Sequence, residues 1–110
     1  MFSHIMVGAD DVEKSKAFYD AVLGELGHKQ GVIDAKGRCF YYTKTGVFSI
    51  SKPIDGEPAC NGNGSTIGFA AADAGAADRW HAAGLANGGV TCEDPPGVRE
   101  GAKGDLYLAY

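Results

Sequence analysis

The chain has 110 residues and a formal net charge of −4, and 45% of its residues are hydrophobic. This length suits one domain with a single core, while the acidic balance without a basic cluster excludes a protein that binds nucleic-acid phosphates. No apolar run approaches the roughly 20 residues of a membrane-spanning helix, and the N-terminus lacks a signal-peptide pattern. Three cysteines without a CxxC pair fit reduced thiols. We therefore expect a cytoplasmic protein that binds neither nucleic acid nor membrane.

The first predicted elements are a short strand from residue 4 and a helix that follows it. Asp10 can cap the helix, and Glu13, three residues on, completes a capping box. Apolar residues recur at helical spacing through the segment, which predicts one face packed on a sheet. Either Gly24 or Gly27 ends the helix.

A pair of strands at residues 38–43 and 47–51 comes next, joined by a tight turn with a glycine. Side chains alternate along a strand, so Arg38, Phe40 and Tyr42 share one side of the first of these strands. The sequence therefore predicts a hairpin whose aromatic residues face two ways.

The chain contains an internal repeat, because residues 4–23 and 66–85 match at a constant offset of 62. Ile5 falls on Ile67 and Phe18 on Trp80 at this offset. Two copies are too few for a solenoid and indicate a duplicated half-domain. We expect a single domain built as module one at 1–56, a Pro-, Asn- and Gly-rich linker at 57–63, and module two at 64–110.

The second half repeats the order of elements found in the first. A strand begins at residue 66, a helix starts near Asp73, and Asn87-Gly88 gives its stop signal. Strands are expected at 89–93 and 104–110, with a Pro- and Gly-rich loop between them. This order predicts an α+β fold with two helices on one face of a mostly antiparallel, curved sheet of about seven strands.

Three stretches of the sequence resemble the vicinal oxygen chelate superfamily, which includes glyoxalase I, bleomycin resistance proteins and extradiol dioxygenases. They are the opening FSHIMVGADDVEKSKAFYDAVLGELG, the start of the second half GNGSTIGFAA, and the closing EDPPGVREGAKGDLYLAY. The resemblance implies two βαβββ modules that form a curved mixed sheet around a cleft, with the final strand absent from this sequence. An unpaired sheet edge invites pairing with another chain, so we expect a homodimer.

The resemblance also carries a set of metal-ligand positions. In metal-dependent members the ligands come from the first and last strands of the two modules, and these positions fall on His4, Thr66 and Ser49, with the fourth beyond the last residue. Imidazole is a good ligand for divalent metals, whereas a neutral hydroxyl is a poor one. We therefore expect no cofactor and no glyoxalase I activity, with a divalent metal at His4 as the alternative.

The candidate ligand-binding residues are those that the mapping or strand alternation directs toward the cleft, together with a loop arginine suited to an anionic group. They are His4, Ser49, Thr66, Tyr42, Tyr107 and Arg99. By the mapping, the first three point into the cleft together. The loop arginine has a solvated role as its alternative, and the sequence assigns no catalytic residue.

These observations predict a glyoxalase/bleomycin-resistance-like protein that binds a small organic molecule in the inter-module cleft, without an intact metal centre. The alternative is a metal-dependent lyase or dioxygenase of the same superfamily. A metal-free enzyme that uses the same cleft is a third possibility.

Overall fold

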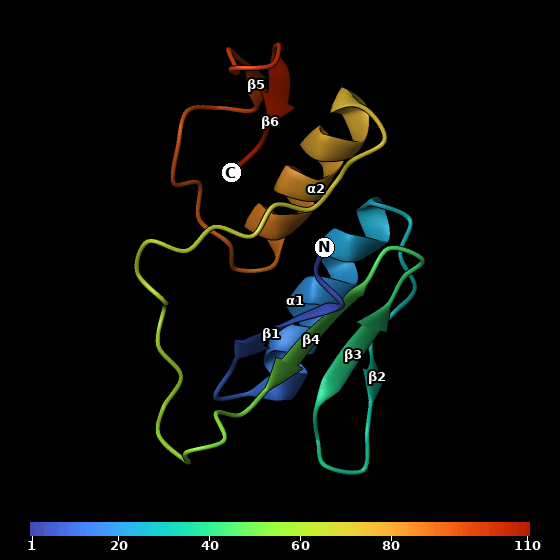
Figure 1. Cartoon of the computed structure of the whole chain (residues 1–110), viewed down its shortest axis with the longest axis vertical. Coiled ribbons are helices and arrows are strands. Elements are labelled where there is room, and N and C mark those ends of the chain that lie inside the picture. Colours follow the sequence, from blue (N-terminus) through green and yellow to red (C-terminus); the bar gives the residue numbers. More distant parts are fainter.

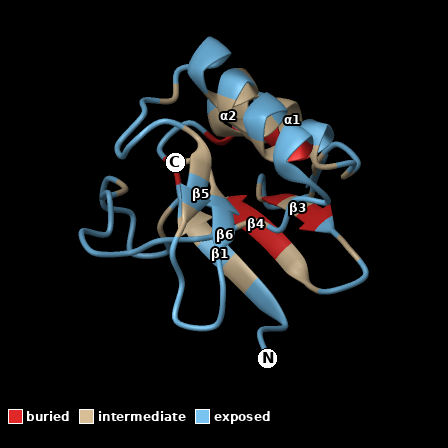
Figure 2. Ribbon diagram, turned by 90° about the horizontal axis from the view of Figure 1, so that it is seen from above, coloured by how far each residue is buried: buried red, intermediate tan, exposed pale blue.

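The computed structural model describes all 110 residues and has the α+β organisation that the sequence predicts (Figure 1). The elements in chain order are β1 (His4–Gly8), α1 (Val12–Glu25), β2 (Val32–Ile33), β3 (Cys39–Tyr42), β4 (Val47–Ser51), α2 (Ala74–Ala86), β5 (Gly97–Arg99) and β6 (Leu106–Leu108). The two helices pack against each other and form a layer on one side of the strands (Figure 2). Neither helix has the length and apolar character needed to cross a membrane.

The strands form two separate sheets. The larger has the order β1-β4-β3-β2, in which β1 runs parallel to β4 and the other neighbours are antiparallel. The smaller contains only β5 and β6, which pair antiparallel. Since β1 pairs only with β4, its outer edge has no partner in this chain.

Equivalent aspartates start the two helices. The Asp11 carboxylate accepts a hydrogen bond from the Lys14 backbone N–H at 3.0 Å, and the Asp73 carboxylate accepts one from the Ala76 N–H at 2.7 Å. Each bond satisfies one of the free N–H groups of a first turn. The two bonds lie 62 residues apart, so the repeat in the sequence is also a repeat in the capping geometry.

The prediction that Asp10 caps α1 is wrong. Asp11 is the N-cap residue, which places Glu13 one position too early in the helix to complete a capping box. The Asp10 carboxylate instead accepts a hydrogen bond from the Ala59 N–H at 2.7 Å. Asp10 therefore holds the connection between the halves against the start of the helix.

Both helices end with a glycine in the left-handed region, Gly27 at φ +82° and Gly88 at φ +97°. The next N–H after each glycine closes the terminal turn, from His28 to the Leu23 carbonyl and from Gly89 to the Gly84 carbonyl. This is the usual glycine C-terminal motif. Of the two glycines predicted to end the first helix, the structure selects Gly27.

The hydrophobic core lies between the larger sheet and α1 (Figure 2). The most deeply buried side chains come from the helix and from the two central strands: Val22, Leu23, Cys39, Tyr41 and Ile50. From the second half, Phe69 and Trp80 pack against this core while staying partly exposed. The first module thus supplies most of the core.

A polar network lies at one side of this core, centred on Asp20. Its carboxylate accepts hydrogen bonds from the Tyr41 hydroxyl at 3.0 Å, the Gly31 N–H at 2.9 Å and the Lys16 ammonium at 2.5 Å. Burial alone would raise the pKa of Asp20, but these hydrogen bonds outweigh it and hold the pKa below its usual value. The network fixes α1 to β3.

The expected strands of the second half differ from those observed. Residues 65–70 and 89–93 do not form strands, and residues 66–72 make no backbone hydrogen bond within the chain. The expected strand at 104–110 is shortened to β6, and β5 lies inside the expected loop. An extended segment becomes a strand only beside a partner, and the long connection after β4 runs apart from the larger sheet (Figure 1).

Candidate functional site

One face of the larger sheet packs on α1, and the opposite face is covered by no second layer (Figure 2). We call this the open face. Strand alternation and register place nine residues on it in three rows that cross β3, β4 and β1. The first row is Tyr42, Val47 and His4; the middle row is Phe40, Ser49 and Met6; the last row is Ser51 and Gly8, and Arg38, directly before β3, continues it by alternation.

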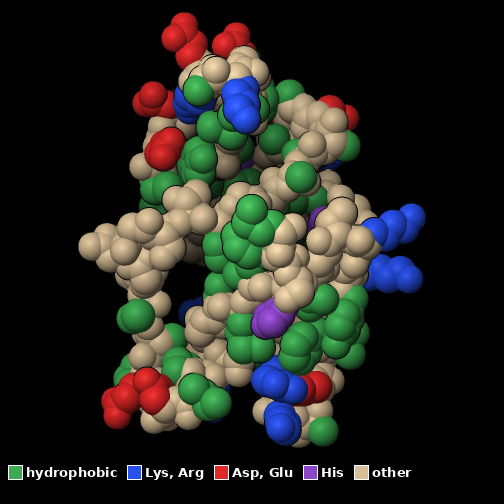
Figure 3. Space-filling model, in the orientation of Figure 1, with side chains coloured by type: hydrophobic (Ala, Val, Ile, Leu, Met, Phe, Trp, Pro, Cys, Tyr) green, Lys and Arg blue, Asp and Glu red, His purple; other side chains and the backbone are tan.

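The open face carries an aromatic stack formed by the half-buried Phe40 and the exposed Tyr42. The rings of Phe40 and Tyr42 lie 5.8 Å apart with planes inclined by only 14°, and the Arg38 guanidinium lies 5.1 Å from the centre of the Phe40 ring. Tyr42 is 67% exposed and Met6 is 45% exposed. Hydrophobic side chains and a histidine are visible together at the surface over this part of the molecule (Figure 3). Exposed aromatic and apolar side chains gathered on one face are typical of a binding site.

A cavity of about 330 Å³ adjoins the first row and lies between the two halves of the chain. His4 and Val47 line it from the first half, and residues 67–69 line it from the second. The His4 Nδ1 atom lies 2.9 Å from the Ser3 hydroxyl oxygen. Since His4 is exposed, its imidazole stands where the open face and this inter-module cavity meet.

Three of the six predicted site residues share the open face, namely His4, Tyr42 and Ser49. Ser49 differs from the other two because it is fully buried, and its hydroxyl donates a hydrogen bond to the Ile5 carbonyl at 3.0 Å. This bond ties β4 to β1 across the sheet. The Ser49 hydroxyl is therefore already used within the protein.

The other three predicted site residues lie in the second half and are not brought to the open face. Thr66 is exposed and does not line the inter-module cavity. The Tyr107 hydroxyl donates to the Asp78 carboxylate at 2.7 Å, which raises the pKa of Tyr107. The Arg99 guanidinium donates to the carbonyls of residues 94 and 95 at 3.0 and 2.9 Å, so much of its donor capacity is spent on its own loop.

A second, more apolar cavity of about 410 Å³ lies beside α2. Phe69, Trp80 and Tyr107 line it, and the Trp80 indole N–H is buried without a hydrogen-bond partner. Buried N–H groups are nearly always paired. Sequence reasoning did not find this cavity, because its walls come from segments joined only in space.

The comparisons with known proteins agree with this fold. A solved structure of a glyoxalase/bleomycin resistance protein from Albidiferax ferrireducens T118 is 59% identical to this chain, with a TM-score of 0.96 over 100% of this chain and 88% of that one. This chain belongs to the glyoxalase/bleomycin resistance protein family. No protein-family model and no curated protein matches it.

Two more distant structures share the fold of this glyoxalase/bleomycin resistance family member. A lactoylglutathione lyase from Agrobacterium tumefaciens is 19% identical, with a TM-score of 0.57 over 94% of this chain and 79% of that one. An integron cassette protein from the mobile metagenome of V. cholerae is also 19% identical, with a TM-score of 0.56 over 97% of this chain and 81% of that one. These likenesses confirm the α+β, glyoxalase-like fold class predicted from the sequence.

The residues at the family's metal positions are not brought together in this chain. His4 and Ser49 lie in different rows of the open face, the Ser49 hydroxyl is committed to a carbonyl, and Thr66 does not join them. The chain contains no group of three or more His, Cys, Asp or Glu side chains arranged to hold a metal ion. Structural zinc sites take four protein ligands, and catalytic zinc sites usually take three.

Proposed function

We propose that this glyoxalase/bleomycin resistance family protein binds a small organic molecule on the open face, beside the inter-module cavity. The observation that carries the proposal is the aromatic stack of the half-buried Phe40 and the exposed Tyr42, with the exposed Met6 alongside, on a sheet face that no other layer covers. Aromatic and apolar surface with a few polar groups is the usual lining of a small-molecule site. His4 provides a polar group at the edge of this surface.

The proposal includes binding without a resident metal. The donor set of His4, Ser49 and Thr66 supports it, because two of the three are neutral hydroxyls and one of those is internally bonded. The unpaired thiols of Cys39, Cys60 and Cys92 support a reducing, cytoplasmic location.

The proposal also includes a homodimer. Support comes from two unpaired stretches of backbone, the outer edge of β1 and residues 66–72. Ile67 and Phe69 correspond to Ile5 and Val7 of β1 by the repeat, so the second stretch has the sequence of a strand. Pairing these stretches between two copies would satisfy the free backbone groups.

Ligand binding is tested with 2-naphthalenemethanol, a neutral aromatic probe, titrated into ¹⁵N-labelled protein. We expect amide shifts confined to β1, β3, β4 and the cavity wall at 67–69. Tyr42→Ser should weaken binding about fivefold, because stacking on an aromatic ring contributes about 1 kcal/mol.

The matched control is Val90→Ser, which removes another exposed apolar side chain, 84% exposed, in the second half. It should leave the affinity unchanged. Shifts that avoid the open face, or an equal loss in both variants, would refute this location for the ligand.

Assembly is tested by sedimentation at micromolar concentration. We expect about twice the 11.4 kDa chain mass. Thr66→Pro, which removes a backbone N–H from the unpaired stretch, should give monomers, whereas Thr66→Ala should remain dimeric. A wild-type mass of one chain would contradict the homodimer.

A further inference from the structure

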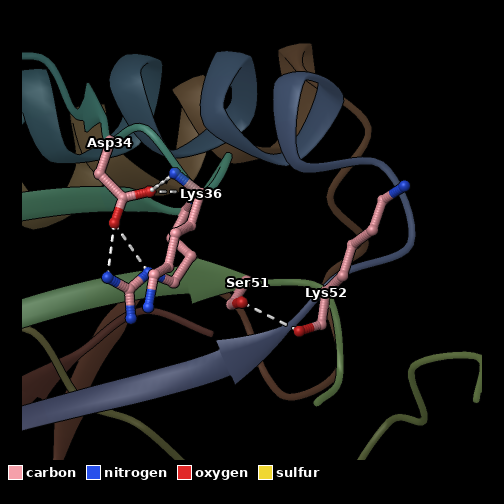
Figure 4. A network of polar contacts seen from close by, with 5 residues as sticks. Asp34, Lys36, Ser51 and Lys52 are labelled. Carbon is pink, nitrogen blue, oxygen red and sulfur yellow. Dashed lines mark hydrogen bonds and ion pairs between the residues drawn. The ribbon is translucent and has the colours of Figure 1, made fainter. Parts of the chain in front are cut away.

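A hollow of about 870 Å³ lies at the last row of the open face. Its floor is formed where the row carries only small side chains, Ser51 on β4 and Gly8 on β1. The walls are the turn at residues 36–38 on one side and residues 52–54 on the other. Figure 4 shows Lys36 and Lys52 on opposite sides of Ser51. We call this space the basic hollow.

The basic hollow has three cationic side chains in its walls and no carboxylate among its lining residues. Arg38 is balanced by Asp34, whose carboxylate accepts hydrogen bonds from the guanidinium Nε at 2.8 Å and Nη2 at 2.5 Å. These bonds hold the pKa of Asp34 below its usual value, so Asp34 keeps its charge. One guanidinium nitrogen, Nη1, makes no bond within the protein.

Lys36 supplies the unbalanced charge. Its backbone N–H donates to Asp34 at 2.9 Å, but its ammonium makes no ion pair or hydrogen bond. The Lys52 ammonium is also unpaired, but it points away from Asp34 (Figure 4), and Lys52 lines a neighbouring hollow together with Asp10 and Glu57. The unpaired Lys36 ammonium beside the neutralised Arg38–Asp34 pair matches an anion with one negative charge.

The basic hollow is continuous with the aromatic stack. Arg38 lies over the Phe40 ring, and Met6 belongs both to the middle row and to the hollow's lining. A ligand whose aromatic ring lies on the middle row would therefore direct a substituent toward the Lys36 ammonium and the unbonded Nη1 atom of Arg38.

We propose that the open face takes a planar aromatic monoanion, with its ring on the middle row and its carboxylate in the basic hollow between Lys36 and Arg38. This inference rests on the proposed ligand-binding function and adds the chemical class of the ligand. Charge-assisted hydrogen bonds from two cationic groups select the carboxylate over a neutral group of the same shape.

The test compares 2-naphthoate with 2-naphthamide, a neutral analogue of nearly the same shape. Their dissociation constants are measured by ¹⁵N NMR titration for wild type, Lys36→Met and Lys44→Met. Lys36→Met deletes only an unbonded ammonium, and Lys44→Met removes the same charge from the turn at the other end of the β3–β4 hairpin. We expect about tenfold tighter binding of the carboxylate in wild type and Lys44→Met, falling below about twofold in Lys36→Met.

The outcomes separate this inference from the proposed function. Equal binding of both probes on the open face would leave the ligand site in place and overturn the monoanion. A preference that survives Lys36→Met, or that is lost equally in Lys44→Met, would also overturn it, because Lys36 would then not be the group that selects the carboxylate. If neither probe shifts open-face amides, the proposed function and this inference both fail. Tighter binding of 2-naphthyl phosphate than of 2-naphthoate would overturn the assignment of a single negative charge.

Discussion

The two halves of this chain share a repeated sequence but differ in how much of it is folded into a core. Nine of the ten buried residues lie in the first half, and Ala76 alone represents the second. In both halves, however, an aspartate caps the helix and a glycine ends it. Both copies of the repeat thus form the helix, but only the first copy forms the four-stranded sheet.

This difference follows from the range of the interactions involved. Helix caps and terminal turns join residues three to five positions apart, so a short sequence specifies them fully. A strand needs a second strand brought from elsewhere. In the first half β4 provides that partner for β1, and residues 66–72 have none in this chain.

The largest expected effect comes from truncating equivalent leucines of the two helices. Leu23 is 2% exposed, and its counterpart at the offset of 62, Leu85, is 48% exposed. Leu23→Ala should lower the free energy of unfolding by about 3 kcal/mol, because it leaves a cavity in the core. Leu85→Ala should cost less than about 1 kcal/mol. Urea unfolding measures the free energy of unfolding of both variants. Similar losses would show that the two halves do not differ in how much they contribute to the core.

A smaller effect is expected at Asp20, whose counterpart in the second half is Ala82. Asp20→Asn should cost about 1 to 2 kcal/mol at pH 7, through the loss of a charged hydrogen-bond acceptor for Lys16.

Asp20→Asn should also change how the free energy of unfolding falls at acidic pH. The native pKa of Asp20 is lowered, so its contribution is complete above the unfolded pKa of about 3.9 and is lost as the pH falls through the native value. Urea unfolding at pH 7, 5 and 3 should show a weaker decline for Asp20→Asn than for wild type. Parallel declines would show that the network does not contribute.

The smallest effects should be equal in the two halves. Asp11→Ala and Asp73→Ala should each cost about 1 kcal/mol, because each loses one N-cap hydrogen bond. Asp10→Ala is the matched control for helix capping, since its side chain bonds the connection at Ala59. Circular dichroism during thermal unfolding measures all three. A much larger loss for Asp11→Ala alone would mean that capping, too, depends on the formed sheet.

The helices and the first hairpin could be predicted from the sequence because their signals are local. The choice of Asp11 over Asp10 as cap could not, since adjacent aspartates offer the same chemistry and tertiary contact with Ala59 decides between them. The strands expected from residue 66 and at 89–93 did not form, for a different reason. Their sequences have strand character, but pairing depends on partners that this chain does not bring beside them.

The sequence could predict those parts of the candidate site that depend on the alternation of side chains along a strand. Alternation correctly grouped Arg38, Phe40 and Tyr42 on one face, while it could not show that the Ser49 hydroxyl is spent on the Ile5 carbonyl. The sequence suggested that Arg99 could bind an anionic group, but its guanidinium donates hydrogen bonds to carbonyls of its own loop. Met6 and Lys36 gave no motif signal, because their position beside the aromatic stack arises from strand register and a turn.

Residues 67–69 line both the inter-module cavity and the apolar cavity beside α2, and they lie within the stretch proposed to pair with a second copy. Pairing would therefore fix the walls of both cavities at once. By thermodynamic linkage, a ligand that prefers the fixed walls would tighten the association of two chains, and association would tighten ligand binding by the same factor. The apparent affinity for ligand would then rise with protein concentration, so that the amount of protein in the cell would itself set the sensitivity of the site.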